Sequence, residues 1–125
     1  MIIIKTSTDS HKAMKKIANE LLNNKLAACI NMIPRMRSKY IMDGRITESR
    51  EVILLIKTTE KLESKVYKTI KELHNYEIPE ISTIQTSNVD KDYEKWLNDF
   101  VENYFMKIEN PTEKNVLKLV IVTLS

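Results

Sequence analysis

Apolar and polar residues follow two different periods along the N-terminal part of the chain. Residues 2–6 form a short apolar run, which predicts a first strand. Residues 8–10 then offer side-chain oxygens for a helix N-cap. After them, apolar residues recur at the three- and four-residue spacing of a helix with one buried stripe, namely at Met14, Ile17, Ala18, Leu21 and Leu22. We expect this helix to stop near Asn23 and Asn24.

Two long extended runs follow, and the residues between them predict a tight hairpin. The runs cover residues 26–40 and 45–58, with Asp43-Gly44 between them. A two-residue hairpin turn needs positive φ angles, which Asp-Gly accommodates, and Gly44 is the only glycine of the chain. The alternative is that part of residues 31–40 forms a loop, because this stretch combines Pro34 with Arg35, Arg37 and Lys39.

A helix, a strand and another helix follow the hairpin. Thr59 is a candidate N-cap for a helix with apolar positions at Leu62, Val66, Ile70 and Leu73. Residues 78–86 predict a strand, and Asp90 then opens a third helix that Pro111 should end. Residues 116–124 have the composition of a strand, and they suit an edge strand, a cover for a neighbouring subunit or a disordered end.

The order β-α-β-β-α-β followed by a helix predicts an α+β, ferredoxin-like fold. We expect one domain over residues 1–110 and an extension over 111–125. Strands usually run about 5 or 6 residues, whereas each hairpin arm could run about a dozen or more, so its far end should project beyond its own sheet. The apolar residues there should be covered by other copies of the chain in a closed, symmetric oligomer; they are Met32, Ile33, Met36, Tyr40, Ile41 and Met42.

Composition and charge narrow the class of protein further. A length of 125 residues, with 42% hydrophobic and 30% charged residues, is typical of a single globular domain. We expect no membrane partner and a cytoplasmic location, because no apolar run is long enough to span a bilayer and no leader precedes the first strand. A single cysteine suits a reducing compartment. The 20 basic and 17 acidic residues are interspersed, which argues against a nucleic-acid partner.

Motifs of known chemistry are sparse. With one glycine the chain has no Gly-rich phosphate loop, nucleophile elbow or dinucleotide fingerprint, which excludes those enzyme classes. Its two histidines and one cysteine lack the spacing of a structural zinc site, so a metal site would have to be weak or shared between chains. We therefore expect a binding protein and not an enzyme.

His74 and Cys29 are the residues best suited to a ligand site. His74 ends the second predicted helix and begins a segment that also contains Tyr76, Glu77 and Glu80. The helix C-terminus favours a protonated imidazole, which suits an ion pair with either glutamate. A structural turn network and a ligand site are both open for this segment. Cys29 has small and apolar neighbours that suit a buried packing thiol, with a metal or redox role as the alternative.

Several separate motifs, in order over about residues 2–103, match one known family. They are Leu26-Ala27-Ala28-Cys29-Ile30-Asn31, Ile33-Pro34, Ser38-x-Tyr40, Gly44-x-Ile46, Glu51-Val52, Leu54-Leu55-Ile56-Lys57-Thr58, His74-x-Tyr76-Glu77-x-Pro79-Glu80-Ile81 and Tyr93-x-x-Trp96-Leu97. With them the chain resembles the CutA family of divalent-cation tolerance proteins. The resemblance implies a ferredoxin-like subunit in a tight homotrimer, linked to tolerance of copper and other divalent ions such as zinc, with no catalytic reaction.

The resemblance also implies a cleft between subunits. Carried over residue by residue, the cleft contains candidate metal ligands at His74, Glu80 and Cys29, and other ligand-binding residues at Lys57, Tyr76, Glu77 and Tyr40. This chain departs from the family pattern in two places. Some members ligate copper with a cysteine and two adjacent histidines, at positions that hold Lys5, Leu73 and His74 here. The aromatic residue usual before the glycine turn is Met42.

Two functions of different classes follow from these observations. The first is a trimeric protein that binds a divalent metal ion, with copper as the first candidate, in clefts between subunits. The second is a signalling or scaffold trimer, similar in architecture to the nitrogen-regulatory PII proteins, that binds a small anionic ligand through Lys57. Hydrolysis of an acyl phosphate on the same fold is disfavoured, because that chemistry needs a Gly-rich anion cradle.

Overall fold

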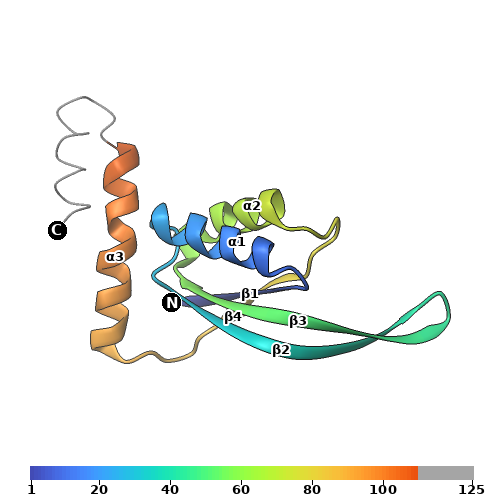
Figure 1. The fold of residues 1–125 in the computed structure, drawn as a ribbon. Coiled ribbons are helices and arrows are strands. Elements are labelled where there is room, and N and C mark those ends of the chain that lie inside the picture. Colours follow the sequence, from blue (N-terminus) through green and yellow to red (C-terminus); the bar gives the residue numbers. More distant parts are fainter. Residues whose placement is uncertain (110–125) are drawn as a thin grey trace.

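The structure is a computed structural model that describes residues 1–109 (Figure 1). Its elements follow the predicted order, and the α+β, ferredoxin-like fold is confirmed. They are β1 (Ile2–Thr8), α1 (His11–Asn23), β2 (Cys29–Met42), β3 (Arg45–Thr58), the 3₁₀ helix η1 (Glu60–Leu62), α2 (Glu63–Leu73), β4 (Ile81–Gln85) and α3 (Lys91–Glu109). The predicted extension at 111–125 lies outside the described residues, so its role stays a prediction.

The four strands form one antiparallel sheet in the order β2-β3-β1-β4. Helices α1 and α2 lie together on one face of this sheet (Figure 1). Alternate residues of β1 and β3 face these helices and are buried, as the two-residue period of a strand requires; they include Ile2, Ile4, Leu54 and Ile56. The intervening residues point to the other face, which neither α1 nor α2 covers.

The helix ends follow local capping chemistry. Ser10 Oγ accepts a hydrogen bond from the Ala13 backbone at 3.1 Å, and Asp90 Oδ2 accepts from the Tyr93 backbone at 3.2 Å, so both predicted N-caps are confirmed. Helix α1 ends in a Schellman motif, in which Lys25 takes a positive φ of 60°. Thr59 was expected to cap α2, but its side chain makes no capping hydrogen bond, because η1 precedes α2 there.

Two predicted strand boundaries are wrong for the same reason, a lack of pairing partners. Residues 26–28 are a buried connection and not strand, since β2 begins to pair with β3 only at Cys29, opposite Lys57. Strand β4 covers Ile81–Gln85 and not residues 78–86, because its pairing with β1 ends at Ile81, opposite Thr6. Residues 74–80 therefore form an irregular segment between α2 and β4.

The β2–β3 hairpin is as long as predicted. Each arm has 14 residues, and the far half extends well beyond the rest of the sheet (Figure 1). Asp43 and Gly44 form the tip with φ angles of 53° and 76°, as expected for a turn that needs two left-handed residues. The alternative of a loop within residues 31–40 is wrong, since the strand continues through Pro34.

A β-bulge at Pro34 and Arg35 decides which hairpin side chains share a face. Ile33 pairs with Ile53, but the next pair is Met36 with Glu51, so β2 has one extra residue there. Because side chains alternate with a period of two, the extra residue reverses the faces of all later β2 residues. Met36, Ser38, Tyr40 and Met42 consequently continue the uncovered face of the sheet, while Arg37, Lys39 and Ile41 continue the face that carries the helices.

Candidate functional site

The irregular segment at residues 74–80 is fixed to β1 through His74. The Tyr76 backbone N–H donates to His74 Nδ1 at 3.0 Å, and His74 Nε2 lies 2.8 Å from the Ser7 carbonyl oxygen. Nδ1 therefore accepts, and Nε2 carries the proton that it donates to Ser7. This arrangement holds the neutral tautomer and not the imidazolium expected at a helix C-terminus. Neither predicted glutamate partner contacts the ring.

Further side-chain contacts fix the same segment. Asn75 accepts a short hydrogen bond from the Thr8 hydroxyl and donates to Asp9 Oδ1 at 2.7 Å. The Tyr76 hydroxyl donates to Glu51 Oε2 at 2.8 Å. Burial and the nearby Glu51 carboxylate raise the pKa of Tyr76 well above its usual range, so the phenol keeps its proton. The segment is a structural turn network in the subunit, with partners that sequence reasoning did not identify.

The two candidate carboxylates, Glu77 and Glu80, both lie exposed on this segment. Glu80 Oε2 is 3.3 Å from Lys5 Nζ, so the lysine that departs from the family pattern neutralises a candidate metal ligand. Glu77, but not Glu80, lines a concavity, together with Tyr67, Lys71, Ile78, Pro79 and Ile81. Both carboxylates can bind a cation from solvent, but for Glu80 the salt bridge to Lys5 must first break.

Cys29 and Lys57 lie opposite each other at the other end of the sheet. The Cys29 thiol is free and only half-buried in the subunit, where the sequence predicted a buried packing thiol, because Cys29 begins an edge strand. Lys57 Nζ lies 5.4 Å from the centre of the Tyr93 ring at the start of α3. A cation over an aromatic face is attracted by the ring quadrupole, so this contact draws the Lys57 ammonium toward α3.

The candidate residues do not meet within one subunit. Lys57 pairs with Ile3 on β1, whereas His74 contacts Ser7, about 13 Å further along that strand at 3.3 Å per residue. Tyr40 lies near the hairpin tip, about 35 Å from Cys29 along β2 by the same rise. Within residues 1–109, no group of three or more His, Cys, Asp or Glu side chains could hold a metal ion. The subunit thus divides the candidates among three places.

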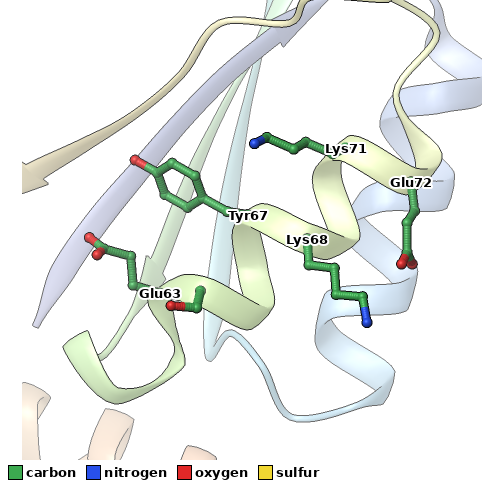
Figure 2. Close-up of a pocket in the computed structure, with 6 residues that line it drawn as sticks. Glu63, Tyr67, Lys68, Lys71 and Glu72 are labelled. Carbon is green, nitrogen blue, oxygen red and sulfur yellow. The ribbon is translucent and has the colours of Figure 1, made fainter.

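A separate concavity of about 640 Å³ lies along α2, and it contains none of the candidate residues. Figure 2 shows Tyr67 and Lys71 extending toward one side of the helix, while Lys68 and Glu72 point toward another. Two acidic and two basic side chains line it, so it has no excess charge; the full lining is Glu63, Ser64, Tyr67, Lys68, Lys71 and Glu72. No helix of the described chain is long and apolar enough to cross a bilayer.

Comparisons with known proteins agree with this arrangement. Residues 2–100 match the family model described as CutA1 divalent ion tolerance protein. A divalent-cation tolerance protein CutA from Pyrococcus horikoshii is 38% identical over 97 residues, which are 78% of this chain and 94% of the relative. The corresponding Thermus thermophilus protein is 32% identical over 97 residues, again 78% of this chain and 94% of the relative.

Solved structures give the same result. The crystal structure of the divalent ion tolerance protein CutA1 from Ehrlichia chaffeensis superimposes with a TM-score of 0.77 at 31% identity. The match covers 80% of this chain and 94% of that one. Sequence, fold and the order of the motifs thus all lead to one family, and the chain belongs to the CutA1 divalent ion tolerance proteins.

Proposed function

We propose that this protein is a homotrimer that acts in divalent-cation tolerance and binds the cation, copper first among the candidates and zinc second, in clefts between subunits. The observation that carries the proposal is the separation of the candidate residues. Tyr40 lies about 35 Å along β2 from Cys29, so only another copy of the chain can bring such residues together. A binding protein in the cytoplasm, and not an enzyme, fits the sparse chemistry of the sequence.

The uncovered face of the sheet supports assembly. Ile3, Ile53 and Leu55 lie half-buried on this face, and Ile84 is exposed beside Ile3. Because of the β-bulge, Met36, Tyr40 and Met42 of the hairpin lie on this same uncovered face. An apolar surface of this extent on an isolated subunit is typical of a protein interface. Closed threefold symmetry allows each hairpin to cover the sheet of a neighbouring subunit.

The carboxylates near the cleft support cation binding. Glu77 and Glu80 are exposed, and a salt bridge to a partly exposed lysine is weak enough for a divalent ion to displace. In the subunit both nitrogens of His74 make hydrogen bonds, so ligation through Nδ1 requires that the Tyr76 N–H contact opens. Glu80 is therefore the ligand that we place first, with His74 as the ligand that joins after the segment rearranges.

Isothermal titration calorimetry with Cu(II) and Zn(II) tests this function. The informative variants are Glu80→Gln and His74→Ala, and Glu72→Gln is the matched control, because it removes one exposed carboxylate from α2 without touching the cleft. We expect the trimer to bind copper, Glu80→Gln to weaken binding about tenfold, and Glu72→Gln to match the wild type. Negligible binding by the wild type, or equal binding by all variants, contradicts the proposal.

An anionic ligand is the second candidate, and Lys57 is the residue that favours it. Within the described residues no carboxylate forms an ion pair with Lys57, and its contact is the Tyr93 ring. A thermal-shift screen of nucleotides and small carboxylates against wild type and Lys57→Ala distinguishes this function. Stabilisation by an anion that depends on Lys57 supports it, and no stabilisation by any anion excludes it.

A further inference from the structure

Three arginines surround a small concavity in the projecting half of the hairpin. Arg35, Arg37 and Arg50 line it together with Glu48, and its volume is about 420 Å³. We call these four residues the arginine pocket. The register places Arg37, Glu48 and Arg50 on the face of the sheet that carries the helices. The projecting half of the hairpin extends beyond these helices (Figure 1). All four residues are exposed in the subunit.

The charges in the arginine pocket are not balanced. Arg37 and Arg50 are direct cross-strand partners, an arrangement that is unfavourable for two like charges. Glu48 Oε1 lies 2.8 Å from Arg37 Nε and neutralises one guanidinium. Within the described residues Arg35 and Arg50 form no ion pair. The pocket therefore has two guanidinium groups in excess of its single carboxylate.

The β-bulge creates this arrangement. Without the extra residue, Arg37 would point to the opposite face from Arg50, because every later side chain of β2 would be reversed. Arg35 occupies the bulge itself with a left-handed φ of 63°, a conformation that is unfavourable for a residue with a side chain. Strand β2 therefore contains an unfavourable backbone conformation close to a like-charge cross-strand pair. Neither feature stabilises the exposed hairpin. Combinations of this kind are typical of binding sites.

We propose that the arginine pocket binds a small, multiply charged oxyanion, namely a phosphate or pyrophosphate group. The planar guanidinium presents paired N–H donors that match two oxygens of such a group. Two unneutralised guanidiniums suit one dianion, and binding removes the repulsion between Arg37 and Arg50. The pocket lies on the face of the hairpin opposite Met36, Tyr40 and Met42. The site is independent of the cation cleft.

Calorimetry of the full-length protein with inorganic pyrophosphate in low-salt buffer tests the proposal. The key variant is Arg50→Gln. The matched control is Arg45→Gln, which removes one positive charge from the same hairpin, but on the opposite face and outside the pocket. We expect wild type and Arg45→Gln to bind alike, and Arg50→Gln to bind about tenfold more weakly. Arg50→Gln should fold at least as well as the wild type, because it removes a like-charge pair.

Three results overturn the proposal. One is no measurable heat with wild type at millimolar pyrophosphate. Another is equal weakening by Arg45→Gln and Arg50→Gln, which would mean general attraction by charge and no defined site. The last is dissociation of the oligomer by Arg50→Gln without any pyrophosphate binding, which would assign the pocket to acidic side chains of a second copy. Sedimentation velocity on the same samples separates this last result from the others.

Discussion

The apolar tip of the hairpin provides the sharpest test of assembly. Ile41 and Ile46 face each other across the tip and are 74% and 78% exposed in the subunit. The double substitution Ile41→Ser and Ile46→Ser removes their apolar surface at positions that contact neither the core nor the helices. The substitution should therefore leave the fold of each subunit intact and change only its association. The double change Ile41→Val and Ile46→Val is the matched control, since it keeps most of that surface.

The expected size of the effect follows from these exposed fractions. Burying an isoleucine side chain completely contributes about 1.5–3 kcal/mol, so the three quarters left exposed offer about 1–2 kcal/mol to an interface. Two such side chains on each of three subunits give roughly 7–13 kcal/mol for the assembly. The lower value already corresponds to about five orders of magnitude in the dissociation constant of a trimer.

Sedimentation velocity over a dilution series measures this effect directly. We expect wild type and the valine control to sediment as trimers at micromolar concentration, and the serine variant to sediment as a monomer with an unchanged circular dichroism spectrum. If the serine variant assembles as tightly as wild type, the face of the tip that carries Ile41 and Ile46 takes no part in assembly. If wild type is itself a monomer, the proposed cleft between subunits has no basis.

Three further predictions concern stability and are measured by urea unfolding at fixed protein concentration. Tyr76→Phe should cost about 1 kcal/mol at neutral pH, because it removes the hydrogen bond to Glu51. The folded-state pKa of Tyr76 is raised, so this stabilisation is present below about pH 10 and lost as the pH rises toward the folded pKa; an identical alkaline profile in the variant would contradict this. Thr58→Val should cost about 1–2 kcal/mol, because the buried Thr58 hydroxyl donates to the Leu26 carbonyl at 2.6 Å, and a neutral effect would mean that water replaces it. Gly44→Ala should cost about 1–2 kcal/mol through its φ of 76° alone, since nothing lies within 4 Å of an added Cβ, and a stabilised variant would show that the turn has changed.

The local features of the fold could be read from neighbouring residues. The two helices that cover the sheet follow from the spacing of Met14, Ile17 and Leu21 and of Val66 and Ile70, all buried as expected. The hairpin follows from Asp43-Gly44, because that pair accommodates two positive φ angles. These signals depend on backbone preferences and on the period of one element, which a short stretch of sequence contains in full.

Only part of the candidate site could be predicted from the sequence. The sequence identified the segment that begins at His74, but it predicted an imidazolium paired with a glutamate. The observed partners are Ser7, which lies 67 residues away, and the Tyr76 backbone. The partner of Tyr76 is Glu51, on a different strand. No local pattern contains such pairs, because the packing of α2 and β4 against β1 and β3 creates them.

The sequence by itself determined the order of the elements, their apolar stripes and the length of the hairpin, since each depends on residues close together in the chain. Tertiary structure alone decided the faces of the hairpin. One extra residue at Pro34 and Arg35 sends Tyr40 to the uncovered face and Arg37 to the opposite face beside Arg50. That outcome depends on the register between two strands, and a single-residue shift in register reverses every side chain that follows it.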